Sequence, residues 1–67
     1  MTDRTKRPPV PPLLYRVEEA ADALRLSRTA IYELIRSGRL RTVKAGSRRL
    51  VPVAALAEYV AALERAA

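Results

Sequence analysis

The sequence predicts a small, mainly α-helical domain in which three helices accompany one short β-hairpin. Three observations indicate this class. Two short segments with helical spacing of apolar residues, 17–24 and 28–37, are separated by only three residues. Two β-prone runs then flank a Gly-containing connection, and an Ala-rich segment with helical spacing follows them. A chain of 67 residues has room for one such domain, which we place at residues 13–67.

Residues 1–12 are expected to form a flexible basic arm ahead of this domain. They contain Arg4, Lys6 and Arg7 together with four of the five prolines. Proline favours the extended polyproline II conformation and cannot continue a helix, because it has no backbone N–H to donate. The alternative is a disordered terminus without a function.

The first helix is expected over residues 17–24. Val17, Ala20, Ala21 and Leu24 fall at i, i+3, i+4 and i+7, so they form one apolar stripe. The residue before the helix is Arg16, whose side chain is a poor N-cap, so this helix start is expected to be weaker than average.

The second helix is predicted to begin after Ser27, a good N-cap residue. Ile31, Leu34 and Ile35 cover one face of it, and polar side chains cover the other. Gly38 follows the helix, as expected for an end in the left-handed conformation. Because about three residues join the two helices, the arrangement is a helix-turn-helix.

Residues 40–44 and 48–51 predict the two strands of a hairpin, with residues 45–47 as the connection. Pro52 fits the first position of a third helix that ends near Ala66. The stripe expected to face the core of the domain from this helix is Val53, Leu56, Ala57, Val60 and Leu63.

Positive charge is concentrated in the middle of the chain. Thirteen Lys and Arg residues against seven Asp and Glu residues give a net charge of +6. Residues 25–49 alone hold eight cations and a single carboxylate, whereas residues 8–24 and 50–67 each carry net negative charge. Such a footprint indicates a nucleic-acid partner, and the alternative is an ordinary solvated basic surface.

Several functional classes are disfavoured by composition. The chain has no Cys and no His, so we expect no disulfide, no thiolate or imidazole metal site, and no nucleophile activated by histidine. We therefore expect no enzyme, no cofactor and no metal. The apolar runs are far shorter than the roughly 20 residues that span a bilayer, so no membrane contact and a cytoplasmic location are expected.

The exposed face of the second helix carries the first set of candidate DNA contacts. A helix fits the major groove, and an arginine can bind guanine through two hydrogen bonds, which suits Arg28 and Arg36. Ser27, Thr29 and Tyr32 suit contacts to phosphate or to the thymine methyl group. For Tyr32 the alternative is packing over the boundary of the core. Glu33 on the same face is expected to be solvated or salt-bridged.

The tip of the hairpin carries the second set of candidate contacts. A small, flexible, basic wing can place arginine in the minor groove or along the adjoining backbone. The alternative is a sheet edge that is charged to prevent aggregation. The candidate residues are Lys44, Ser47, Arg48 and Arg49.

Residues 13–21, 26–40 and 43–49 closely resemble the excisionase-type helix-turn-helix family, which consists of MerR-like winged helix domains. The resemblance runs from about Leu13 to Leu63. Members of this family usually have Ser or Thr just before the first helix and Gly in the first turn, where this chain has Arg16 and Arg25.

The resemblance implies that the second helix enters the major groove and that the wing contacts the minor groove, through the candidates named above. Small members of the family resemble recombination directionality factors, which bind and bend attachment-site DNA and turn a tyrosine integrase towards excision. We therefore expect sequence-specific binding to double-stranded DNA at the bacterial nucleoid. We expect a monomer in free solution and cooperative self-assembly on DNA.

Two alternatives stay open. The chain resembles a small transcription regulator equally well, since such a protein uses the same DNA-binding domain. A protein-interaction module that uses the Ala-rich third helix belongs to a different class.

Overall fold

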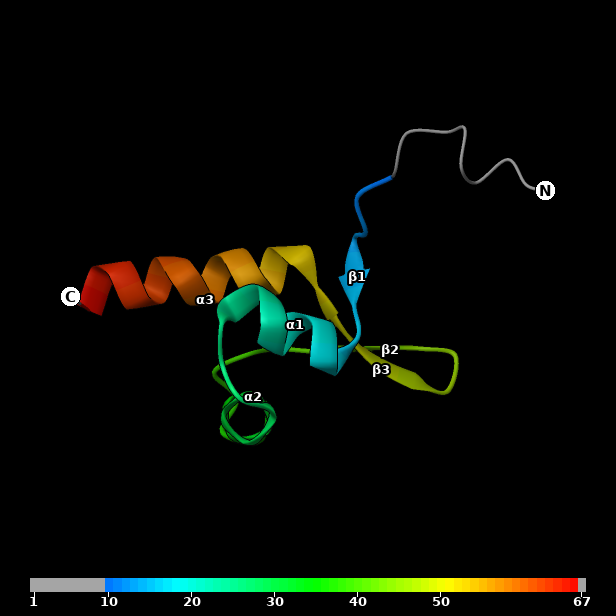
Figure 1. Ribbon diagram of the computed structural model, residues 1–67, viewed down its shortest axis with the longest axis horizontal. Helices are drawn as coiled ribbons and strands as arrows, with labels where there is room; N and C mark the ends of the chain where they lie inside the picture. Colours follow the sequence, from blue (N-terminus) through cyan, green and yellow to red (C-terminus); the bar gives the residue numbers. More distant parts are fainter. Residues whose placement is uncertain (1–9, 67) are drawn as a thin grey trace.

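A computed structural model describes residues 10–66, and it confirms the predicted class, a winged helix-turn-helix with three helices. The predicted arm, residues 1–12, lies mostly outside the described residues, and residues 10–12 have no regular secondary structure. The elements, in chain order, are β1 (Leu14–Tyr15), α1 (Val17–Leu24), α2 (Arg28–Arg36), β2 (Val43–Ala45), β3 (Arg48–Pro52) and α3 (Val53–Ala66) (Figure 1).

The sheet has three antiparallel strands in the order β1-β3-β2, and its strand β1 was not predicted. Leu14 pairs with Pro52 and Tyr15 pairs with Val51. A strand of two residues is too short to show an alternating pattern, so no local signal marks it. It exists because β3 offers a free edge to a segment far away in the sequence.

Pro52 ends β3, so its predicted place at the first position of the third helix is wrong. Proline has no N–H to donate, and the next residue supplies the bond instead: the Val53 N–H donates to the Leu13 carbonyl at 2.9 Å. Helix α3 therefore begins at Val53, directly after the strand, without a connecting loop.

The first strand of the hairpin starts later than predicted, at Val43 rather than at residue 40. Leu40 instead completes the end of α2. Its N–H and that of Arg39 both donate to the Leu34 carbonyl, at 3.1 and 2.9 Å, and its side chain is buried. Gly38 has a φ of 81°, which confirms the left-handed helix end.

The two helix starts are capped by different groups. The Ser27 hydroxyl accepts a hydrogen bond from the Ala30 N–H at 3.1 Å, as predicted. At the start of α1 the Glu19 carboxylate accepts from the backbone N–H of Arg16 at 2.8 Å. Glu19 thus compensates for the poor capping side chain of Arg16. This hydrogen bond, together with the Arg16 side chain, holds the pKa of Glu19 below its ordinary value.

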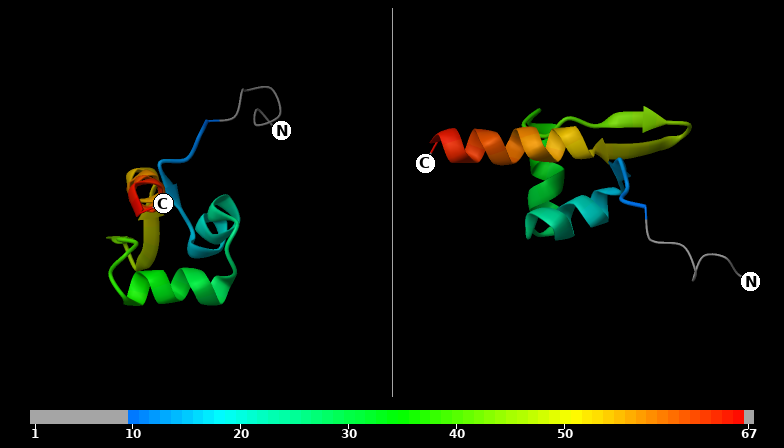
Figure 2. Two further views of the ribbon diagram at one scale, coloured as in Figure 1. Left: turned by 90° about the vertical axis from the view of Figure 1, so that its left-hand side faces the viewer. Right: turned by 90° about the horizontal axis from the view of Figure 1, so that it is seen from above.

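The core lies where α1, α2, the sheet and the start of α3 meet (Figures 1 and 2). Figure 1 shows α2 end-on while α3 runs across the view, so these two helices cross. Small side chains at Ala20 and Ala21 let α2 approach α1 closely. The buried residues are Val17, Ala20, Ala21, Ile31, Leu34, Leu40, Val51 and Ala55.

The predicted core stripe of α3 is only partly right. Leu56 packs against the core as expected, but the fully buried residue of the helix is Ala55, and Tyr59 is the second packing partner. Val53, Val60 and Leu63 remain 38%, 40% and 52% exposed. An Ala-rich helix is apolar on more than one face, so the direction in which β3 enters it decides which face is buried. No helix among residues 10–66 is long and apolar enough to cross a membrane.

Candidate nucleic-acid interface

Helix α2 presents a polar face to solvent, opposite its buried face. Ile31 and Leu34 point into the core, while Thr29, Glu33 and Tyr32 are exposed. Tyr32 is 45% exposed, which places it at the boundary of the core with part of its ring accessible. Ser27, Arg28 and Arg36 are exposed at the two ends of the same helix, so all of the candidates from the second helix are accessible.

Both arginines of α2 are held by weak ion pairs. Arg36 lies 3.4 Å from the Glu33 carboxylate, and Arg28 lies 3.7 Å from that of Glu18 at the start of α1. All four side chains are more than half exposed. Exposed pairs of this kind contribute about 0–1 kcal/mol, so they orient the two arginines without preventing another anion from binding them.

The wing consists of β2, β3 and the turn at Gly46 and Ser47, where Gly46 has a φ of 64°. Lys44 is paired with Arg49 across the hairpin, and Ala45 is paired with Arg48. The candidate side chains Lys44, Ser47, Arg48 and Arg49 are all exposed. The wing therefore carries three accessible cations close to its tip.

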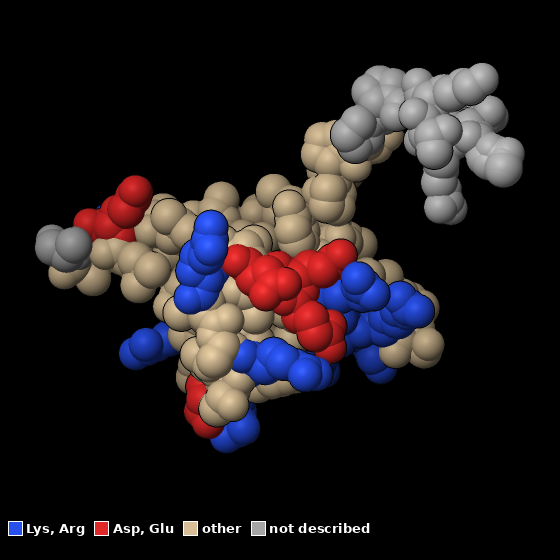
Figure 3. Space-filling model, in the orientation of Figure 1, with Lys and Arg blue, Asp and Glu red and all other residues tan. Residues whose placement is uncertain are grey.

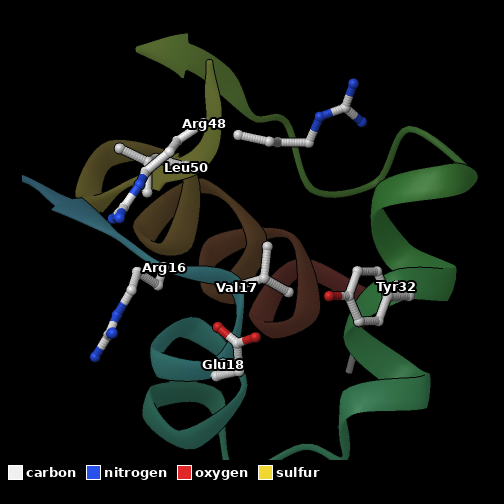
Figure 4. Close-up of a pocket in the computed structure, with 7 residues that line it drawn as sticks. Arg16, Val17, Glu18, Tyr32, Arg48 and Leu50 are labelled. Atoms are coloured by element: carbon white, nitrogen blue, oxygen red, sulfur yellow. The ribbon is translucent and has the colours of Figure 1, made fainter. Parts of the chain in front are cut away.

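A cleft of about 480 Å³ lies between α2 and the wing. Its lining comes from the start of α1 (Arg16, Val17, Glu18), from Tyr32 of α2, and from β3 (Arg48, Arg49, Leu50). Figure 4 shows the Tyr32 hydroxyl pointing into the cleft from one side, whereas Arg16 and Arg48 lie at the opposite edge. The fold thus brings α2, the wing and the start of α1 around one cleft that is lined by three arginines.

Three of the nine predicted contact residues line this cleft: Tyr32, Arg48 and Arg49. The other six lie outside it, on α2, at its N-cap or on the wing, and they are Ser27, Arg28, Thr29, Arg36, Lys44 and Ser47.

Arg16 is a lining residue that sequence reasoning missed. The sequence suggested only that it is a poor helix cap, yet its side chain is 62% exposed and lies at the edge of the cleft. The available signal was its charge, since a cation stands here directly before the first helix.

One of the cations in the basic segment has a structural role. The Arg41 Nε and Nη2 groups donate to the two carboxylate oxygens of Glu58 at 3.0 and 2.9 Å. This forked hydrogen bonding raises the pKa of Arg41 and lowers that of Glu58. Arg41 therefore ties the segment before β2 to α3.

The space-filling view shows how the two signs of charge are distributed (Figure 3). Lys and Arg gather over α2 and over the wing, and the carboxylates of α1 lie between them. No group of three acidic side chains in the described range 10–66 is arranged to hold a metal ion.

Comparison with known proteins agrees with this geometry. The helix-turn-helix domain family matches residues 14–63. A probable excisionase of Saccharopolyspora erythraea is 43% identical over 51 residues, which cover 76% of this chain and 52% of that protein. The chain therefore spans about half the length of this curated relative. No solved structure matches the chain significantly.

Proposed function

We propose that this chain, which belongs to the excisionase-type helix-turn-helix family, binds specific sites on double-stranded DNA with α2 and the wing. The observation that carries the proposal is the cleft between these two elements, because an exposed polar helix face and a basic hairpin flank it together. A duplex that follows both elements places α2 in the major groove and the wing at the neighbouring minor groove.

The contacts divide into two kinds. Arg36 and Arg28 read base edges from the exposed face of α2, and Ser27, Thr29 and Tyr32 contact the backbone or a thymine methyl group. The Ser27 hydroxyl accepts from the Ala30 N–H and keeps its own proton for a phosphate oxygen. Lys44, Ser47, Arg48 and Arg49 hold the backbone and the minor groove from the wing.

The biological role that we propose is that of a recombination directionality factor. The similarity to a probable excisionase supports this role. In this role the chain binds and bends attachment-site DNA in the bacterial cytoplasm, and it directs a tyrosine integrase towards excision. The chain is monomeric in solution, and neighbouring copies assemble cooperatively on DNA. The exposed side chains of Val60 and Leu63 on α3 are available for contacts between copies.

The proposal is tested by footprinting and gel shifts. The DNA is the attachment-site region of the mobile genetic element that encodes this chain. We expect protection of neighbouring sites, a bend in the fragment, and a slope of log K against log salt of roughly −4 to −5, which corresponds to four to six phosphate contacts at about 0.9 each. An in vitro excision reaction with the element's own integrase should require the chain. Protection of a promoter with no effect on excision would instead identify a transcription regulator.

A further inference from the structure

We infer that Arg16 and Arg48 together bind one phosphate of the DNA backbone at the edge of the cleft. This inference rests on the proposed DNA binding and extends the interface beyond α2 and the wing to the start of α1. Arg16 and Arg48 come from segments more than thirty residues apart, and both line the same hollow. Figure 4 places them at the same edge of it.

The charge around the cleft favours an anion. Three arginines line it against one carboxylate, Glu18. That carboxylate already has Arg28 at 3.7 Å, so its charge is partly neutralised. Among residues 10–66, neither Arg48 nor Arg49 has a carboxylate within ion-pair distance. These two side chains are therefore accessible to a bound anion without first breaking an ion pair to a described residue.

The Arg16 side chain can exchange its present partner, Glu19, for a phosphate, because the start of α1 is capped without it. The Glu19 carboxylate accepts from the Arg16 backbone N–H at 2.8 Å, which satisfies the start of α1. The Arg16 guanidinium lies 3.2 Å from the same carboxylate, with the two side chains 62% and 44% exposed. Such an exposed pair is weak, whereas an arginine fork on a phosphate forms stronger, charge-assisted hydrogen bonds.

A phosphodiester of duplex DNA is the anion that this place fits. The cleft lies between the element proposed to enter the major groove and the element proposed to reach the minor groove, and the backbone separates these two grooves. The Tyr32 hydroxyl points into the cleft from the opposite side. A phosphate contact at this point fixes the register of the protein on the duplex and reads no base.

Single methylphosphonate substitutions test this inference. Each replaces one charged phosphate of a 25-bp duplex that carries the footprinted site with a neutral group. When the methylphosphonate stands at one position next to the wing, the wild-type chain should bind the duplex about eightfold more weakly in 0.1 M salt. This factor follows from a slope of log K against log salt of about 0.9 in magnitude for one phosphate contact. The double variant Arg16→Ser with Arg48→Ser should not respond at that position, and each single variant should respond less than the wild-type chain.

The controls separate this contact from folding and from net charge. Serine is a better N-cap than arginine, so Arg16→Ser should keep or raise the melting temperature. Arg16→Lys should keep most of the affinity. Arg65→Ser, at the far end of α3, removes the same charge away from the cleft and should respond to every methylphosphonate as the wild-type chain does.

Three outcomes contradict the inference. The first is an Arg16→Ser variant with wild-type affinity and a wild-type methylphosphonate profile. The second is an equal loss in Arg16→Ser and Arg65→Ser, which indicates an effect of net charge. The third is that Arg16→Ser and Arg48→Ser lose their response at two different positions, which means two separate phosphates. A wild-type chain that does not bind the duplex at low salt would overturn the proposed function instead.

Discussion

Lys44 and Arg49 are paired directly across the β2–β3 ladder of the wing, so two cations occupy one cross-strand position. Like charges in this arrangement destabilise a sheet, by roughly 0.2–1 kcal/mol for a single pair. Both side chains are exposed, and each strand contributes one of them. A hairpin selected for stability alone would place opposite charges or two β-branched residues here. The pair is therefore consistent with a wing that binds a polyanion.

Replacing Arg49 by Thr should stabilise the free protein and weaken its binding to DNA. The substitution removes the repulsion with Lys44 and introduces a β-branched residue, so we expect a gain of about 0.5 kcal/mol at low salt. Because salt screens the repulsion, part of this gain should disappear at high salt. Urea unfolding at two salt concentrations measures it. Arg48→Thr is the matched control. Arg48 is paired with Ala45, so its replacement relieves no repulsion between opposed cations.

Arg36→Ala and Arg48→Ala should affect DNA binding in different ways. Arg36 lies on the exposed face of α2, so its loss should cost about 1–3 kcal/mol on the specific site and little on random DNA. The loss of Arg48 should weaken binding to both kinds of DNA. Competition gel shifts with specific and random duplexes give the two values. If both variants lose equally on both duplexes, the assignment of Arg36 to base reading is wrong.

Arg25→Gly should raise the stability of the free protein. Arg25 ends α1 with a φ of 61°, in the left-handed region that costs a non-glycine residue about 1 kcal/mol. Glycine removes this cost, so the melting temperature should rise by several degrees. Arg25→Ala keeps the Cβ atom and serves as the control, and its melting temperature should not rise. A gain in the alanine variant would indicate relief of charge repulsion.

The ion pair of Arg41 and Glu58 should make the stability depend on pH in the acid range. Hydrogen bonds from Arg41 lower the pKa of Glu58 from its ordinary value of 4.5. A lowered pKa in the folded state means that the contribution is complete above about pH 4.5 and is lost as the pH falls through the folded value. Glu58→Gln should therefore be less stable than the wild-type chain near pH 7, and the difference should shrink on acidification.

Melting curves between pH 3 and pH 7 check this dependence. Glu64→Gln on the same helix is the control, because Glu64 has no ion pair within the described part of the chain. Its melting temperature should stay parallel to that of the wild-type chain. A difference for Glu58→Gln that is constant over the whole range would show that the pair does not stabilise the fold through its charge.

Leu63→Gln should reduce cooperative binding without changing the affinity for a single site. Leu63 is 52% exposed on α3, away from the cleft, so its loss should not disturb the core or the proposed DNA contacts. Adjacent copies on DNA are held at high effective concentration, so even a small apolar contact increases occupancy. Gel shifts on fragments with one, two and three sites measure this effect. Constant affinity per site in the wild-type chain would remove cooperative assembly from the proposed role.

Sequence alone determined the parts of this protein that depend on neighbouring residues. The apolar spacing from Val17 to Leu24, the Ser27 cap and the left-handed Gly38 are local features, and each is present as predicted. The polar face of α2 follows in the same way from the apolar spacing of Ile31, Leu34 and Ile35. The concentration of cations in residues 25–49 needs no structure to be seen, since charge is a property of composition.

Only the tertiary structure decided the features that depend on residues distant in the chain. Strand β1 forms because β3 has an edge to pair with, and Pro52 lies within that pairing rather than in a helix. The buried face of α3 is set by its entry from β3, since an Ala-rich helix is apolar on several faces. The position of Arg16 at the same edge of the cleft as Arg48 of the wing has the same origin. Sequence spacing does not show which distant surfaces of the chain will meet, because that depends on how all the elements pack at once.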